Sequence, residues 1–461
     1  MRRAGACALA SLCVVAALSH ASEARPRFDL RLFARVPPPG KPEGIAVDRG
    51  GTVYVGSSTK GGVDGPPSKV FAFSGTGALE RTYVIAGQDR SDPLYGLYGM
   101  AFDGDGLLYA VDVSPPRIVA LDPRTGAQHD YARFPDVPSC TPFRTIACSD
   151  TLVDRAPFPN YPAFGPDGAM YVTDAQQALI WRIPRGGGKP VVWFTDAGLE
   201  AIVGPNGIGF MPDRRTFLVA LTTQSRPGAA GHPPGLYTLP VLAGGRAGQL
   251  RSFWPSRSND SPDGFAVARS GDVYLAVAGS GGGSDGNAVV VISPRGREIA
   301  RIPATQQANQ KMQVPFDLPA SVAFLGQRAL VTNHAWVSQN PDHYAVLDLF
   351  AGESGLGLFR PSSRKGPVRI TIRGVPTHHC VVHDFEARIR IEGTARLQRV
   401  DVFRDGRRIS TGTRRRVQLR IHASGLAPGR HLLRVRVLVA GGRLVSKRAA
   451  FRRCSEDSDR G

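Results

Sequence analysis

The sequence of 461 residues has few long apolar runs, little helical periodicity and few aromatic residues in its basic region. After an apolar stretch at residues 8–18, no run of apolar residues is long enough to span a bilayer, so we expect no transmembrane segment. Residues 25–358 show almost no apolar spacing of helical period, which excludes an α-rich fold there. The basic C-terminal region nearly lacks aromatic residues that would stack on bases, which argues against nucleic acid as a partner.

The N-terminal stretch has the pattern of a secretory signal peptide. Arg2 and Arg3 precede the short apolar run, and the small residues Ala21 and Ala24 follow it as cleavage points. We therefore expect a signal peptide at residues 1–24 and a secreted or periplasmic protein.

Cysteine is scarce, and four of the six cysteines lie beyond the expected signal peptide. An even number of cysteines in an oxidising compartment favours disulfides. We expect local pairing of Cys140 with Cys148, and a second pair of Cys380 with Cys454. A metal site formed by Cys380 and the histidines near it is the alternative.

The formal charge of +19 is concentrated in one region. Residues 363–461 hold 24 Lys and Arg against 8 Asp and Glu, a balance of +16, which leaves +3 for the first 362 residues. Most of these basic residues are arginines that alternate with apolar residues, as on the solvated face of a sheet. The alternative is a patch that binds an acidic component of an envelope or matrix.

What the sequence does contain is a repeat. Short runs rich in Val, Ile, Phe and Tyr are separated by Gly, Pro, Asp and Asn, a pattern typical of strands and turns. One position of this pattern recurs near residues 43, 98, 160, 206, 263 and 320, at intervals of 55, 62, 46, 57 and 57 residues. Each interval accommodates four short strands, so the repeat predicts a six-bladed β-propeller. Residues 28–36 supply an extra strand that would complete the last blade and close the ring.

The repeat ends after Phe359, and regularly spaced strands with different turn signals begin at Val368. We therefore expect an all-β chain with a propeller at 25–358, a linker at 359–366 and an immunoglobulin-like β-sandwich at 367–461.

The recurring position carries polar residues in four of the six repeats. Glu43, Asn160, Asn206 and Asp263 stand there, whereas the other two repeats carry Tyr98 and Ala320. The innermost strands of a propeller line its channel, so these side chains would converge at one mouth. Two carboxylates and two carboxamides suit Ca²⁺ best, with Mg²⁺ or Mn²⁺ next and Zn²⁺ less favoured without a histidine. The alternative is that each residue merely caps a turn.

These positions resemble the blade starts of the SMP-30/gluconolactonase-like family of six-bladed propellers, in the pairs Glu43-Gly44, Asn206-Gly207 and Asp263-Gly264 and in Asn160. The resemblance implies Glu43, Asn206 and Asp263 as metal ligands and places Asn160 beside the substrate. It also implies lactone hydrolysis, with the metal polarising the carbonyl and Asp263 as general base.

Two neighbours depart from the sugar-lactone members of that family, which often carry Arg two residues before the earlier Asn and Asp directly after it. This chain has Phe158 and Tyr161 there, which favours a more apolar lactone or ester. We assign Tyr98 and Tyr161 to substrate binding. We interpret His334 as a satisfied or exposed loop residue; the alternative is that it faces the channel as a proton-transfer partner. The alternative function is a non-catalytic ligand-binding propeller with a structural metal, anchored by the basic C-terminal domain.

Overall fold

The computed structural model describes residues 25–59, 66–141, 143, 147–279, 286–361, 368–393, 397–439 and 444–455. The expected signal peptide and most of the expected linker lie outside these residues. Among the described residues, no helix is long and apolar enough to cross a membrane.

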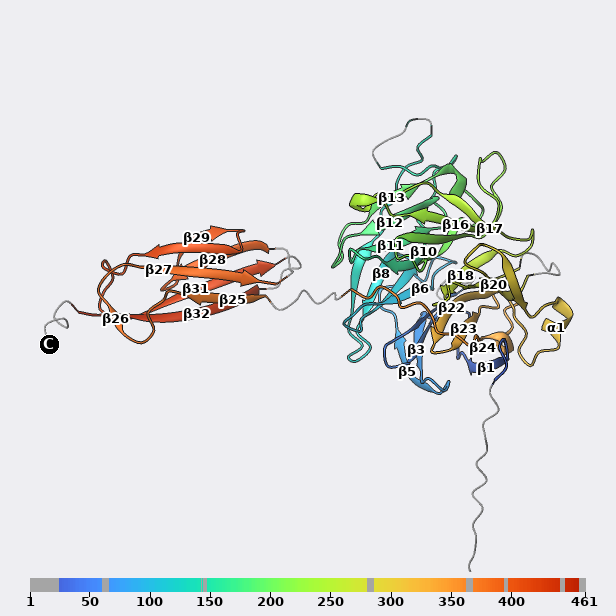
Figure 1. The fold of residues 1–461 in the computed structure, drawn as a ribbon, viewed down its shortest axis with the longest axis horizontal. Coiled ribbons are helices and arrows are strands. Elements are labelled where there is room, and N and C mark those ends of the chain that lie inside the picture. Colours follow the sequence, from blue (N-terminus) through green and yellow to red (C-terminus); the bar gives the residue numbers. More distant parts are fainter. Residues whose placement is uncertain are drawn as a thin grey trace, which may run out of the picture.

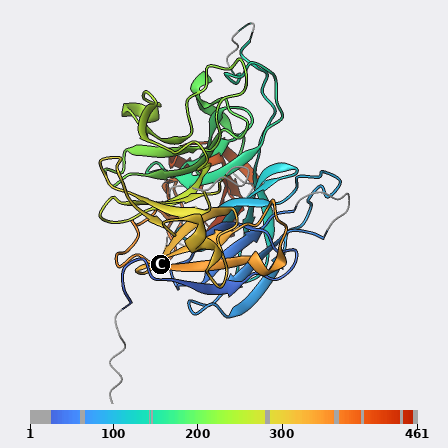
Figure 2. The same ribbon diagram turned by 90° about the vertical axis from the view of Figure 1, so that its right-hand side faces the viewer.

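Six four-stranded antiparallel sheets surround a common centre and confirm the expected propeller (Figures 1 and 2). The first blade consists of β2 (Pro42–Val47), β3 (Val53–Ser57), β4 (Lys69–Phe73) and β5 (Leu79–Val84). The second consists of β6 (Leu97–Phe102), β7 (Leu108–Val113), β8 (Pro116–Leu121) and β9 (Gln128–Arg133). The third consists of β10 (Pro159–Phe164), β11 (Met170–Asp174), β12 (Leu179–Ile183) and β13 (Val191–Thr195). The fourth blade consists of β14 (Pro205–Phe210), β15 (Thr216–Leu221), β16 (Gly235–Pro240) and β17 (Arg251–Pro255). The fifth consists of β18 (Pro262–Val267), β19 (Val273–Val277), β20 (Ala288–Ile292) and β21 (Glu298–Ile302).

The sixth blade closes the ring with the first strand of the described chain. It consists of β22 (Pro319–Leu325), β23 (Arg328–Asn333), β24 (Ala345–Phe350) and β1 (Leu30–Arg35), and β1 pairs antiparallel with β24. The prediction that an N-terminal strand completes the last blade is thus confirmed. The short helices are η1 (Ala197–Leu199), η2 (Ala243–Gly245), α1 (Gln306–Gln310) and η3 (Pro341–His343).

The core of the propeller lies between adjacent blades. The second and third blades, for example, share a cluster in which Tyr109 packs edge-on against Phe164, with the fully buried Trp181 in the same cluster. Burying an aromatic side chain of this size stabilises the fold by about 1.5–3 kcal/mol. Five further clusters join the other neighbouring blades, so the innermost strands stand on a packed frame.

Two further sheets follow the propeller and enclose a separate apolar core. The three-stranded sheet contains β25 (Arg369–Arg373), β27 (Phe385–Glu392) and β30 (Arg416–Ile421). The five-stranded sheet contains β26 (Cys380–Val381), β28 (Leu397–Arg404), β29 (Arg407–Gly412), β31 (Gly429–Val439) and β32 (Leu444–Arg453). The immunoglobulin-like identity of these sheets and the domain boundaries stay predictions.

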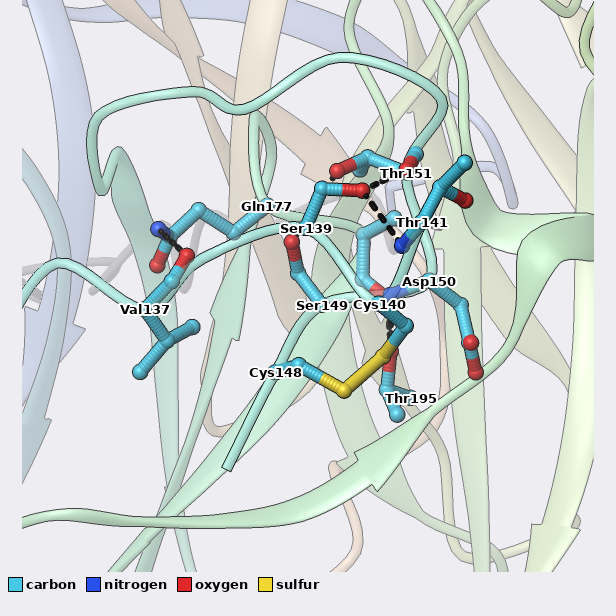
Figure 3. Close-up of a disulfide and its surroundings, with 11 residues drawn as sticks. Val137, Ser139, Cys140, Thr141, Cys148, Ser149, Asp150, Thr151, Gln177 and Thr195 are labelled. Atoms are coloured by element: carbon cyan, nitrogen blue, oxygen red, sulfur yellow. Dashed lines mark hydrogen bonds between the residues drawn. A yellow bond between two sulfur atoms is a disulfide. The ribbon is translucent and has the colours of Figure 1, made fainter. Parts of the chain in front are cut away.

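Both predicted disulfides are confirmed. Cys140 and Cys148 close a loop between β9 and β10, with their Cα atoms 5.0 Å apart (Figure 3). This loop is tied to its surroundings by main-chain bonds, such as that from the Cys140 N–H to the Ser149 carbonyl at 2.7 Å. Cys380 of β26 pairs with Cys454, which directly follows β32, the neighbouring strand of the five-stranded sheet. Two disulfides are typical of a protein that folds outside the cytoplasm.

Candidate metal centre

The recurring position is the second residue of each innermost strand, where every blade has the same irregularity. All six innermost strands shift register between their first and fourth residues. A bulge of this kind redirects side chains and is common next to functional sites. In five of the six strands the first residue is proline, which has no N–H to donate and fixes the backbone before the bulge.

Threonines of the second strands hold these bulged segments in place. Thr332 Oγ donates a hydrogen bond to the Glu43 carbonyl at 2.7 Å, across the junction of the sixth and first blades. Thr173 Oγ does the same for the Asn206 carbonyl at 2.6 Å, from the third blade to the fourth. The backbones of Glu43 and Asn206 are therefore each held by the neighbouring blade.

The glycines that follow the candidate ligands are required by close approach of the strands. A Cβ atom on Gly44 would lie 1.9 Å from the Tyr98 carbonyl oxygen, and one on Gly207 would lie 2.6 Å from that of Asp263. No side chain fits at such distances, so glycine lets neighbouring innermost strands converge. The Glu-Gly and Asn-Gly pairs seen in the sequence have this physical basis.

Three of the four polar side chains are buried, Asp263 is partly buried, and all four are incompletely hydrogen-bonded. Glu43, Asn160 and Asn206 are no more than 3% exposed. Within the described chain, one oxygen of each of the four has no hydrogen-bond partner: Glu43 Oε2, Asn160 Oδ1, Asn206 Oδ1 and Asp263 Oδ1. Each such buried oxygen costs about 1–3 kcal/mol, so four of them at one repeat position require an explanation.

A hard divalent cation would satisfy these oxygens. Asn206 donates its amide Nδ2 to Thr222 Oγ at 3.2 Å, which leaves Oδ1 as the group that can bind a ligand. Ca²⁺ prefers carboxylate and carboxamide oxygens, and all four groups are of that kind. No group of three or more His, Cys, Asp or Glu side chains suited to a metal occurs in the described residues, so such a site depends on its two carboxamides.

The pKa values of the two carboxyl groups are also consistent with a cation site. Burial, and then the nearby Asp263, hold the pKa of Glu43 well above its usual value. Burial also raises the pKa of Asp263, although hydrogen bonds from Gly264 and Asn206 oppose the rise. Two buried carboxylates at one place are unfavourable together, and a divalent cation between them would remove that cost.

His334 joins this group, although the sequence gave little sign of it. Its Nδ1 lies 3.1 Å from Glu43 Oε2, without the alignment of a hydrogen bond, and its Nε2 lies 2.7 Å from Ser58 Oγ. Burial lowers the pKa of His334 to about 3, with a smaller contribution from Lys41, so the ring is neutral. The expectation of a satisfied histidine holds, whereas an exposed loop residue is wrong because the side chain is buried.

The aromatic residues expected at the substrate lie in the same region. Tyr98 and Tyr161 are buried, and both carboxyls, Glu43 and Asp263, help to raise the pKa of each after burial itself. The ring of Tyr98 packs edge-on against Phe158, with centroids 5.2 Å apart. Their role in binding stays a prediction.

Part of the propeller matches the model of a known protein family. Residues 194–332 match the family model described as the SMP-30/Gluconolactonase/LRE-like region, which includes Asn206 and Asp263. No curated protein matches the chain at a significant level.

Solved structures of similar proteins include regucalcin, a calcium-binding protein from Agrobacterium tumefaciens, at 20% identity and a TM-score of 0.49, covering 73% of this chain and 98% of that one. Virginiamycin B lyase from Staphylococcus aureus is similar at 14% identity and a TM-score of 0.43, covering 70% and 98%. A luciferin-regenerating enzyme is similar at 14% identity and a TM-score of 0.46, covering 70% and 96%. The matched region spans the fourth and fifth blades and half of the sixth, so this part of the propeller is similar to the SMP-30/gluconolactonase family.

Proposed function

We propose that this protein is an exported, metal-dependent hydrolase of lactones or related esters. The observation that carries the proposal is the set of four buried oxygens without hydrogen-bond partners in the described chain, gathered at the starts of the innermost strands. Glu43, Asn206 and Asp263 would hold the cation, for which Ca²⁺ fits the donor set best. When bound, a divalent cation supplies Lewis-acid polarisation of a carbonyl oxygen.

The other catalytic and binding roles are assigned to individual side chains of the site. Asp263 is the candidate general base, because Asp263 Oδ1 is buried without a partner and burial raises the pKa of the carboxyl. Asn160, whose carboxamide oxygen also lacks a partner, would orient the substrate. The buried rings of Tyr98 and Tyr161 exclude water there and favour an apolar acyl chain over a polyhydroxylated one.

Hydrolysis of a lactone panel of graded ring size and chain length tests the proposal. Protein stripped by a chelator should be inactive, and added Ca²⁺ should restore the activity. Asp263→Asn should remain folded but lose activity by at least about a hundredfold. Asp167→Asn is the matched control, because Asp167 lies in the hairpin turn between β10 and β11 and is paired with Arg182. A Ca²⁺-loaded protein that hydrolyses no member of a broad panel would refute the proposal.

A second candidate function is attachment to an acidic polysaccharide through the C-terminal sheets. Along the solvent-facing side of the three-stranded sheet, the exposed residues include six arginines and two glutamates: Arg369, Arg373, Arg388, Arg390, Arg416, Arg420, Glu386 and Glu392. Arg373 stands opposite Arg388, and Arg390 stands opposite Arg416. Like charges directly opposite each other destabilise a sheet. Glu386 and Glu392 pair with Arg388 and Arg390 and offset part of this repulsion, and a bound polyanion would relieve the rest.

Binding to polygalacturonate at several salt concentrations separates this function from general electrostatic attraction. Replacing Arg388 and Arg390 with serine should weaken binding and lower its salt dependence. Replacing Arg448 and Arg452 of β32 with serine removes the same charge from the other sheet and is the control. Equal losses in the two double variants would contradict a specific face.

A further inference from the structure

The far ends of the six innermost strands enclose a second space in the channel. A cavity of about 610 Å³ lies there, and its lining includes none of Glu43, Asn160, Asn206 or Asp263. Each blade contributes a residue without a bulky side chain at the fifth position of its innermost strand: Ala46, Ala101, Ala163, Gly209, Ala266 and Ala323. The sixth position is Phe or Val in every blade. The wall is therefore apolar, and the volume is in the range of small-molecule sites.

Residues 354–361, after β24, close this end of the channel as a strap. Leu356 donates its N–H to the Val267 carbonyl at 2.7 Å in the fifth blade. The ring of Phe359 packs edge-on against Phe210 of the fourth blade at 5.0 Å. Gly104 of the second blade donates to the Pro361 carbonyl at 2.9 Å. The strap thus crosses the mouth and covers the apolar wall.

Three arginines also line this cavity, namely Arg49, Arg214 and Arg360. In the part of the chain that the structure describes, none of the three forms an ion pair with a carboxylate. Burial and the adjacent Arg49 lower the pKa of Arg360, against an opposing contribution from Asp48. Arg360 donates to the Val47 carbonyl at 2.6 Å and Arg214 donates to that of Gly357. A guanidinium has five N–H donors, so donors remain for a ligand.

Arg214 has a backbone conformation that favours glycine, which suggests that its side chain is kept for a function. In the other five blades, the hairpin turn after the innermost strand has a glycine at the left-handed position: Gly51, Gly106, Gly168, Gly271 and Gly326. The fourth blade has Arg214 there, at a φ of 59°. A residue with a side chain costs about 1 kcal/mol or more in that conformation. The Arg214 guanidinium lies 4.0 Å from the Phe359 ring centroid, at the edge of the cavity.

We propose that this cavity binds a small amphipathic carboxylate. Its alkyl or aryl body would lie among the small and aromatic side chains, and its carboxylate would meet the arginines beside the strap. The apolar wall disfavours a polyhydroxylated ligand, because hydroxyl groups would lose their hydrogen bonds to water. The unpaired guanidinium groups disfavour a cation. None of the four oxygen-bearing residues of the proposed hydrolase centre lines this cavity, although Tyr161 borders both, and the proposal does not depend on that centre.

Calorimetric titration with octanoate, and with 1-octanol as its uncharged counterpart, tests this site. Octanoate should bind one molecule per chain, and octanol should bind more weakly. Arg360→Met should weaken octanoate binding by about tenfold to a hundredfold and leave octanol binding little changed. Arg215→Met is the matched control, because Arg215 is exposed, adjacent to Arg214 and absent from the cavity wall.

Two further variants separate the alternatives. Ala163→Leu fills the cavity and should abolish binding of both probes, with its folding checked by thermal unfolding. Asp263→Asn should leave octanoate binding unchanged, which distinguishes this cavity from the metal centre. Absence of octanoate binding, or equal losses in Arg360→Met and Arg215→Met, would overturn the proposal. If Ala163→Leu does not fold, the two arginine variants decide.

Discussion

Removal of Ca²⁺ should destabilise the propeller, and the effect should grow with pH. Both Glu43 and Asp263 have pKa values raised by burial in the metal-free protein, so each keeps its proton above the pH at which it would ionise in an unfolded chain. A group with a raised folded pKa stabilises the fold below its unfolded pKa and loses that contribution as the pH rises through the folded pKa. The metal-free protein should therefore become less stable as the pH rises above about 4.

Cation binding works in the opposite direction. A divalent ion needs both carboxylates ionised, so at a pH below their raised pKa values its binding releases protons. Ca²⁺ affinity should then rise with pH, by up to about tenfold per unit for each proton released. At a Ca²⁺ concentration a hundred times the Kd, the stabilisation is about 2.7 kcal/mol. For a propeller of this size we expect that to raise the Tm by about 5 °C.

Thermal unfolding at pH 5 and pH 8, with Ca²⁺ and with chelator, measures this effect. Calorimetric titration in two buffers of different ionisation enthalpy counts the protons released. Asp263→Asn should release fewer protons and bind Ca²⁺ more weakly, whereas Asp167→Asn should behave like the unmodified chain. A Ca²⁺ stabilisation that is the same at both pH values, with no proton release, would refute the assignment of the two buried acids to a metal.

Three further predictions follow from individual contacts. His334→Gln should keep the fold but weaken Ca²⁺ binding by about tenfold to a hundredfold, because His334 lies 3.1 Å from Glu43; calorimetry measures this, and unchanged affinity would contradict it. Gly207→Ala should abolish Ca²⁺ binding and lower stability by about 1–3 kcal/mol, since its Cβ would meet Asp263; Gly412→Ala, where nothing lies within 4 Å, is the control. Replacing Cys380 and Cys454 with serine should destabilise the C-terminal sheets by about 4 kcal/mol, as measured by denaturant unfolding, and should leave the propeller transition unchanged.

The sequence was sufficient to predict the ring of six blades, because the same pattern recurs six times along the chain. The proline before each of the four polar residues marks the bulge, and a glycine after Glu43, Asn206 and Asp263 marks the close approach of strands. Both features are local, so they can be recognised in a single sequence. Pairing of the cysteines followed from their even number and their expected compartment.

The contacts of His334 could not be predicted in this way. His334 and Ser58 are 276 residues apart and meet because the sixth blade packs against the first. The cavity at the other end was missed for a different reason. Arg214 reads as an ordinary basic turn residue in the sequence, and its left-handed backbone is visible only beside the five glycines of the other blades.

The two ends of the channel are built from the same six strands, but one end carries polar side chains and the other carries mainly apolar ones. Four of the six second residues carry a carboxylate or carboxamide, whereas the fifth and sixth residues line the cavity with alanine, glycine, valine and phenylalanine. A bulge separates the two sets in every blade, so a change at one end need not alter the register at the other. Substitutions at independent sites act additively. The double variant of Asp263→Asn and Arg360→Met should therefore lose Ca²⁺ binding and octanoate binding to the same extents as the two single variants, and a large departure from additivity would show that the channel acts as one site.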